Sequence, residues 1–129
     1  MSFGQRRPVR VFCVDDQQLF RNALRELIAA TPGLTHVGEA ASGQEAIAAV
    51  AALRPDLVLM DVRMPGLDGF ETARVLVPGR RGLVLVLMSA GPIELPSGFP
   101  PHGGEVRVVT KGELCSRTLL DLWHGRRTR

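Results

Sequence analysis

A short, entirely apolar run that ends in an aspartate places the strongest constraint on what this chain can fold into. The run, Leu57–Met60, follows Pro55-Asp56 and is ended by Asp61. Such a run predicts a strand that is buried on both faces, as in a parallel sheet covered by helices. Open α/β sheets bind ligands at the carboxyl ends of their strands, where an ionised carboxylate needs a compensating cation or partner. Asp61 is therefore the first candidate functional residue.

Strand-like and helix-like segments alternate along the whole chain. Apolar runs predict the strands, and apolar residues at helical spacing predict the helices between them. The predicted strands are 9–14, 36–40, 57–60, 83–88 and 106–109, and the predicted helices are 17–30, 42–53, 68–77 and 113–124. One parallel sheet with helices on both faces accounts for this order most simply. A chain of 129 residues can form one such domain, but not two.

One connection departs from this alternation, between the strands predicted at 83–88 and 106–109. The segment 91–104 contains four prolines and four glycines. Because these residues disfavour a helix, we expect an irregular crossover. The fourth helix of a regular alternation, which would lie between these two strands, should be missing or irregular. We predict one domain over 9–124, an N-terminal tail over 1–8, and a basic C-terminal tail or linker stub over 125–129.

The distribution of charge argues against a nucleic-acid-binding protein, although the net charge is +3 and the isoelectric point is near 9.6. Six of the 16 basic residues lie in the first ten or last four positions, and aromatic residues make up only 5%. No basic stripe interleaved with aromatic residues remains, so direct nucleic-acid binding is not expected. Membrane-spanning and secretion segments are not recognisable, and Cys13 and Cys115 lack metal-ligand spacing. We expect a cytoplasmic protein with reduced thiols and no membrane partner.

Polar residues follow four of the predicted strands, where a doubly wound sheet would bring them to one edge. They are Asp15-Asp16, Asp61, Ser89 and Lys111. Taken singly, the Asp15-Asp16 pair could cap a helix, Ser89 could be an ordinary strand-end hydroxyl, and Lys111 could lie on the surface by chance. Lys111 is nevertheless the only lysine beside 15 arginines, which favours a place where a compact ammonium is needed.

Together these residues predict a phosphoryl-transfer site. Neighbouring carboxylates repel one another, and all-oxygen ligands suit Mg²⁺. An aspartate can attack phosphorus and form an acyl phosphate. The metal and Lys111 would neutralise the phosphoryl oxygens, and Ser89 could donate a hydrogen bond to one of them.

The chain resembles the receiver domain of two-component response regulators over about residues 9–124. The matching segments are VFCVDDQQLFRNAL, PDLVLMDVRMPGLDGFE, LVLMSA and VVTKGEL. Their sequences most resemble those of receivers that precede a LuxR-type helix-turn-helix output domain. The resemblance implies a flavodoxin-like fold with a five-stranded parallel sheet in the order 2-1-3-4-5. It implies a sensor histidine kinase as partner, a homodimer as a possible assembly, and transcription regulation if an output domain exists.

The resemblance also implies a role for each candidate site residue. Asp61 would be the phosphoacceptor, Ser89 the switch hydroxyl, and Lys111 the counter-charge of the phosphoryl group. Asp15, Asp16 and Asp61, with the backbone carbonyl of Arg63, would hold Mg²⁺. The enzymatic activity would at most be self-phosphorylation from a phosphodonor and autodephosphorylation.

Two departures from the family pattern keep a second hypothesis open. Receivers usually carry Tyr or Phe on the fifth strand shortly before the lysine, whereas that strand reads Val106-Arg107-Val108-Val109 here and the chain has no tyrosine. The irregular crossover also replaces the fourth helix that receivers usually carry between the fourth and fifth strands. The alternative is a degenerate receiver that binds partners without phosphorylation. A small phosphotransfer hydrolase is disfavoured, because Arg63 occupies the position where such enzymes commonly carry a second aspartate.

Overall fold

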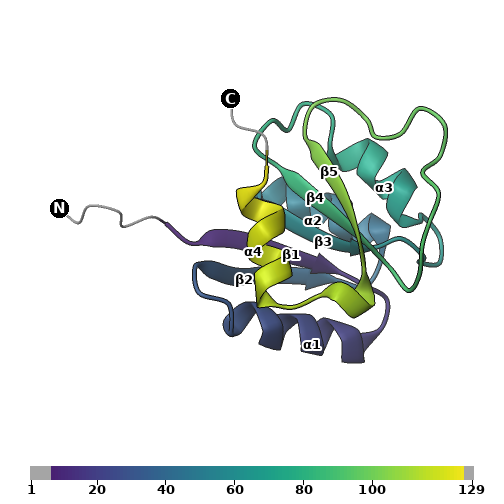
Figure 1. Ribbon diagram of the computed structural model, residues 1–129. Helices are drawn as coiled ribbons and strands as arrows, with labels where there is room; N and C mark the ends of the chain where they lie inside the picture. The colour runs from purple at the N-terminus through teal and green to yellow at the C-terminus, as the bar shows by residue number, and fades with distance from the viewer. Residues whose placement is uncertain (1–6, 127–129) are drawn as a thin grey trace.

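Five parallel strands form the central sheet of the protein in the computed structural model, which describes residues 7–126 (Figure 1). The strands are β1 (Val9–Val14), β2 (Leu34–Ala40), β3 (Leu57–Asp61), β4 (Val84–Ser89) and β5 (Glu105–Thr110). The helices are α1 (Gln18–Ala29), α2 (Gly43–Leu53), α3 (Gly69–Leu76) and α4 (Ser116–His124). The sheet order is β2-β1-β3-β4-β5, which confirms the predicted doubly wound fold and its strand order.

Helices cover both faces of the sheet, so each face has its own apolar core (Figure 1). α2 and α3 contribute Val50 and Leu76 to one core, and α1 and α4 contribute Ile28 and Leu119 to the other. Every residue of β3 is buried, as the apolar run predicts. Burial on both faces explains why β3 has no alternating polar residues.

Side-chain hydrogen bonds influence where α2 and α4 begin. Ser42 accepts a hydrogen bond from the Glu45 amide at 3.2 Å, which caps the start of α2. α4, however, begins at Ser116 rather than near Glu113. The Glu113 carboxylate accepts bonds from the Thr110 amide and hydroxyl at 3.0 and 2.8 Å, which hold Lys111–Glu113 as a separate 3₁₀ turn. Local side-chain bonds thus shorten the predicted helix.

An irregular crossover joins β4 to β5, and residues 90–104 contain no helix, as predicted. Phe99 anchors this segment on the face covered by α3. Its ring is buried and lies edge-on to Phe70 of α3, with centroids 5.1 Å apart. The guanidinium carbon of Arg74 lies 5.5 Å from the centroid of the Phe99 ring. One aromatic side chain therefore replaces part of the apolar cover that a helix would supply.

The described range reaches from just before β1 to just after α4. The predicted tails fall mainly on residues 1–6 and 127–129, which lie outside it. Among the helices of residues 7–126, none is both long and apolar enough to cross a bilayer.

Candidate functional site

Three carboxylates meet at the carboxyl edge of the sheet. Asp15 follows β1 and is fully buried, whereas Asp61 ends the neighbouring strand β3 and is 8% exposed. Asp16 is exposed beside them. One carboxylate oxygen from each of the three residues lies within 4.8 Å of the others. The sheet therefore brings together the three aspartates that the sequence predicts for one site.

Lys111 connects β5 to this carboxylate cluster. Its Nζ donates to Asp15 Oδ2 at 2.9 Å and to Asp61 Oδ2 at 3.4 Å. The same ammonium lies 4.1 Å from the centroid of the Phe20 ring of α1. The sequence gives no signal for this contact, because helical spacing predicts only that Phe20 belongs to an apolar helix face. Phe20 orients the lysine by a cation–π interaction.

Burial and charge shift the pKa values of the two central groups. Burial raises the pKa of Asp61, and the negative charge of Asp15 adds to the increase, while the bond from the Arg63 amide and the Lys111 charge oppose it. Burial alone would lower the pKa of Lys111, but its bond to Asp15 and the charges of Asp15 and Asp61 hold it above its usual value. The lysine is therefore a cation at neutral pH. One ammonium faces three carboxylates, so the site favours a further cation.

The loop after β3 is built around the Asp61 carboxylate. The Arg63 amide donates to Asp61 Oδ1 at 3.2 Å, so Arg63 contacts the carboxylate through its N–H. Gly66 has φ +78°, which favours glycine in this turn. Gly69 donates its amide to Val62 O at 2.7 Å. A Cβ on Gly69 would lie 2.6 Å from the Asp61 carbonyl oxygen, so α3 can begin this close to Asp61 only because Gly69 lacks a side chain.

Ser89 lies at the same edge but is directed elsewhere. It ends β4, is buried, and donates its hydroxyl to the carbonyl oxygen of Gly91. In the strand register it lies beside Thr110, which directly precedes Lys111. The edge thus holds all the residues that the sequence placed there, with the Ser89 hydroxyl bound to the start of the crossover.

The chain is similar in sequence and structure to bacterial response regulators. Residues 11–93 match the family model of the response regulator receiver domain. The DNA-binding transcriptional activator DevR/DosR of Mycobacterium tuberculosis is 38% identical over 121 residues, which cover 92% of this chain and 56% of that protein.

Solved structures show the same relation. A LuxR-family two-component response regulator from Aurantimonas sp. SI85-9A1 superposes with a TM-score of 0.75 at 29% identity, covering 95% of this chain and 89% of that one. The response regulator domain of Thermotoga maritima CheB gives a TM-score of 0.73 at 25% identity, covering 93% of this chain and 96% of that one.

The sequence matches cover only part of the length of each of these regulators. It spans about half of the length of DevR/DosR and 32% of the nitrate/nitrite response regulator NarL of Escherichia coli. The family-model match covers most of the sheet together with the cluster of Asp15, Asp16 and Asp61. The chain therefore belongs to the receiver-domain family of two-component response regulators.

Proposed function

We propose that this receiver accepts a phosphoryl group on Asp61 from a sensor histidine kinase and acts as a phosphorylation-controlled switch. The observation that carries the proposal is the environment of the Asp61 carboxylate. It ends a buried strand, lies within 4.8 Å of the Asp15 and Asp16 carboxylates, and has the Lys111 ammonium 3.4 Å away. A nucleophilic carboxylate, two further anionic ligands and a fixed cation are what phosphoryl transfer to an aspartate requires.

The donor set fits a divalent cation. Asp15, Asp16 and Asp61 offer oxygen ligands only, and their combined charge exceeds that of Lys111 by two. Small divalent cations that prefer oxygen, above all Mg²⁺, match such a site. These aspartates, with the Arg63 backbone carbonyl, would hold the ion. Bound there, Mg²⁺ would supply positive charge for the transferring phosphoryl oxygens.

The residues of the chain have separate tasks in the transfer. A carboxylate oxygen of Asp61 forms the new P–O bond while the P–N bond to the kinase histidine breaks, and the released imidazole keeps the bonding electrons and takes a proton. The burial that raises the pKa of Asp61 makes its carboxylate more basic and a better nucleophile. Lys111 neutralises charge on the phosphoryl oxygens, held in place by Asp15 and Phe20.

Ser89 supplies a route from the site to the crossover. Its hydroxyl donates to the Gly91 carbonyl, at the first residues of the crossover. A phosphoryl group on Asp61 would offer that hydroxyl a charged acceptor, and bonds to charged acceptors are the stronger ones. Exchange of partners would release the start of the crossover. The signal would then leave the site through residues 90–104, without an aromatic side chain on β5.

Phosphorylation with a small donor tests the acceptor role. The chain is incubated with acetyl phosphate and Mg²⁺, and its intact mass is measured. We expect a gain of one phosphoryl group that is lost in Asp61→Asn and when the metal is chelated. Asp121→Asn is the matched control, because Asp121 is exposed on α4. If Asp61→Asn gains the group as wild type does, or wild type gains none, the proposal is wrong.

The surface of β5 supports a second candidate function. Val108 lies on β5 shortly before Lys111 and is 40% exposed, in a strand without an aromatic residue. A receiver with this surface could bind a partner in the same way whether or not Asp61 is phosphorylated. Beryllofluoride with Mg²⁺ distinguishes the two functions. The switch predicts changed amide NMR shifts in residues 90–110, and the interaction module predicts changes confined to the loop after Asp61.

The output of this switch is proposed from its relatives. DevR/DosR is named as a DNA-binding transcriptional activator, and this chain matches about half of it. We therefore propose transcription regulation as the role of this receiver when it is joined to an output domain.

A further inference from the structure

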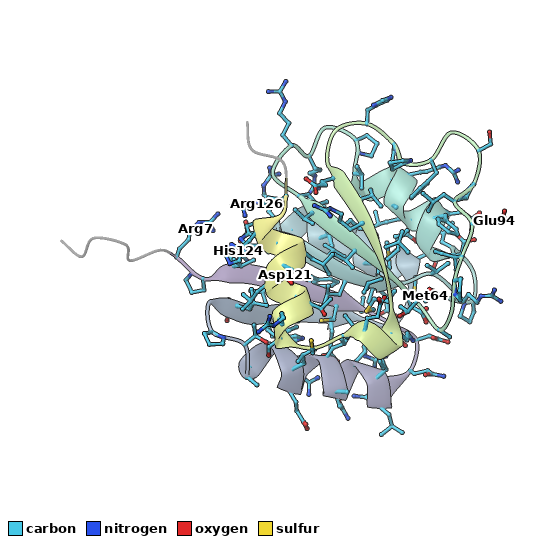
Figure 2. The ribbon with its side chains drawn as sticks, in the orientation of Figure 1. Arg7, Met64, Glu94, Asp121, His124 and Arg126 are labelled. Atoms are coloured by element: carbon cyan, nitrogen blue, oxygen red, sulfur yellow. The ribbon has the colours of Figure 1, made fainter. Side chains whose placement is uncertain are left out.

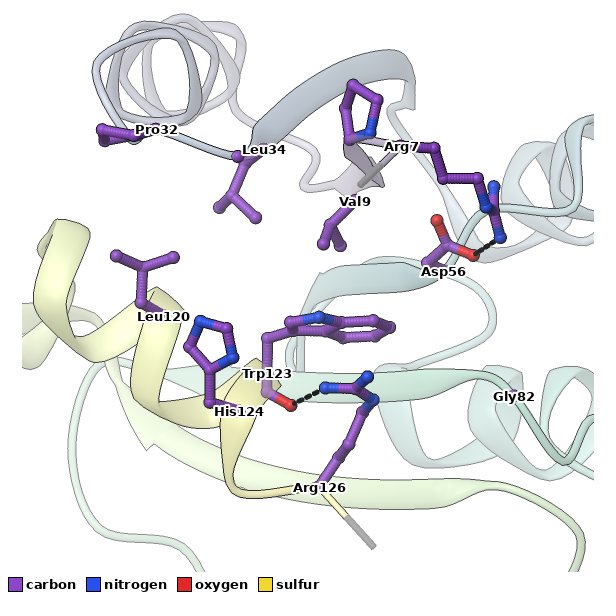
Figure 3. A pocket seen from close by; sticks show the side chains of 12 residues that line it. Arg7, Val9, Pro32, Leu34, Asp56, Gly82, Leu120, Trp123, His124 and Arg126 are labelled. Atoms are coloured by element: carbon purple, nitrogen blue, oxygen red, sulfur yellow. Dashed lines mark hydrogen bonds and ion pairs between the residues drawn. The ribbon is translucent and has the colours of Figure 1, made fainter. Parts of the chain in front are cut away.

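A pocket lies at the opposite end of the sheet from the Asp61 site. It has a volume of about 540 Å³ and is formed by the start of β1, the turn before β2 and the last helix α4 (Figure 3). Its apolar walls are Val9, Leu34, Leu120 and the indole of Trp123. In Figure 2, Arg7, His124 and Arg126 lie at this end, and Met64 of the loop after Asp61 lies at the other. The volume falls within the range of small-molecule sites, about 300–1,000 Å³.

The Trp123 ring forms one wall of a flat space. The guanidinium carbon of Arg126 lies 3.9 Å from the ring centroid, and Arg126 Nη1 donates to the Trp123 carbonyl oxygen at 2.8 Å. Arg126 therefore covers one face of the indole and is held there by its hydrogen bond. Figure 3 shows Val9 and Leu34 across the pocket from the other face. A planar ring inserted there would contact an aromatic face on one side and aliphatic side chains on the other.

The charge around this pocket is positive. Among residues 7–126, Asp56 is the one acidic residue that lines it. Both of its oxygens are engaged: Oδ1 lies 3.3 Å from an Arg7 nitrogen, and Oδ2 accepts from the Arg10 amide at 2.9 Å. An adjoining pocket of about 270 Å³ shares Arg7 and Asp56 and adds three arginines. Those three are Arg54, Arg80 and Arg81. In the described part of the chain, the two pockets together hold five arginines and one carboxylate, which favours an anionic ligand.

We propose that this pocket binds a small aromatic anion, a planar ring that carries one phosphate, sulfonate or carboxylate group. The ring would lie between Trp123 and the Val9–Leu34 wall. The anionic group would lie at the mouth of the pocket, near Arg7 and Arg126. Because Asp61 lies at the other end of the strands, ligand and phosphoryl group can be present together, and the proposal does not depend on phosphorylation of Asp61.

Intrinsic fluorescence reports directly on this pocket, because Trp123 is the only tryptophan and the chain has no tyrosine. The full chain is titrated with adenosine 5′-monophosphate and with naphthalene-2-sulfonate, and calorimetry checks the affinities. Adenosine supplies the ring without the anion, and inorganic phosphate supplies the anion without the ring. We expect saturable quenching of Trp123 by at least one aromatic anion and binding at least about tenfold weaker for adenosine and phosphate, as loss of one charged or stacking contact implies.

Two variants locate the binding. Arg126→Glu should weaken binding of the aromatic anion by about tenfold or more. Arg117→Glu is its matched control, with the same charge change at an exposed position of α4 that does not line the pocket. Val9→Phe fills the space opposite Trp123 and should abolish binding while leaving the unfolding midpoint in urea close to that of wild type.

The proposal is overturned by any of three results. One is that neither aromatic anion quenches Trp123 saturably. Another is that adenosine or inorganic phosphate binds as tightly as the aromatic anion. The third is that binding persists in Val9→Phe, or that Arg126→Glu and Arg117→Glu weaken it equally.

Discussion

Replacement of Gly69 by alanine should destabilise the domain and disturb the Asp61 loop at the same time. The new Cβ would lie 2.6 Å from the Asp61 carbonyl oxygen and 2.8 Å from Val62 Cα. Both are backbone atoms, and neither can rotate away. Relief to an ordinary contact of about 3.4 Å requires α3 to move away from β3 by roughly 0.8 Å, a shift that close-packed interiors resist. The 2.7 Å bond from the Gly69 amide to Val62 O would lengthen with that movement.

The size of the effect follows from these two changes. Overpacking of this kind costs about 1–3 kcal/mol, and a weakened buried hydrogen bond costs about 0.5–1.5 kcal/mol. We therefore expect the free energy of unfolding to fall by about 2–4 kcal/mol. With a urea slope of about 1.5 kcal/mol per M, the unfolding midpoint should fall by roughly 1.3–2.7 M.

Urea unfolding followed by circular dichroism measures this loss. Gly82→Ala is the matched control, because a Cβ there meets nothing within 4 Å and Gly82 has no positive φ. That variant should unfold within about 0.5 kcal/mol of wild type. Gly69→Ala should also accept phosphate from acetyl phosphate more slowly, since the displaced atoms belong to Asp61 and the loop after it. Equal stability of the two variants would refute the argument that α3 is held against Asp61 by the absence of a side chain.

Three further perturbations have defined outcomes. Asp61→Asn in metal-free buffer should raise the free energy of unfolding at neutral pH: because burial raises the folded pKa of Asp61, its ionisation removes stability as pH rises above the ordinary value of 3.8. Urea unfolding across pH should therefore show wild type losing stability relative to the variant as pH rises, and a constant difference would contradict this. Glu39→Gln should lower stability by about 1–2 kcal/mol at neutral pH, where the carboxylate bonds Arg21 and Arg25. Although burial alone would raise it, these bonds hold the pKa of Glu39 below its ordinary 4.5, so the difference should be present above that value and disappear as pH falls through the lowered folded value. Phe99→Ala should reduce the free energy of unfolding by about 3 kcal/mol in a urea titration, because it removes a buried ring, and an effect below about 1 kcal/mol would mean that the crossover is not anchored there.

Much of the fold follows from local patterns. The apolar run before Asp61 predicts a strand buried on both faces, and all of β3 is buried. The prolines and glycines of 91–104 predict a crossover without a helix, and none forms there. The start of α4 was predicted too early, because the bonds from Thr110 to Glu113 stop the chain from joining the helix until Ser116. A side-chain bond across three residues competes with helix formation in a way that apolar spacing does not report.

The candidate site divides in a similar way. The order of polar residues at strand ends predicts which side chains share an edge, and the structure brings Asp15, Asp16 and Asp61 within reach of one ion. Sequence could not distinguish the two neighbouring aspartates from each other. The end of β1 buries Asp15 completely, where it meets Lys111, and leaves Asp16 exposed. That difference depends on which way each side chain points once the strand has packed.

The kind of sheet, the place of Asp61 at a strand end and the lack of a helix between β4 and β5 could all be predicted from the sequence, because each depends on residues adjacent in the chain. Which distant groups meet depends on the packing of the whole fold. Lys111 reaches Asp15 across 96 residues and rests on Phe20, and Arg7, Asp56 and Trp123 line one pocket. Such contacts arise from how helices and strands pack together. Apolar periodicity reports the state of the backbone, whereas packing determines the neighbours of each side chain.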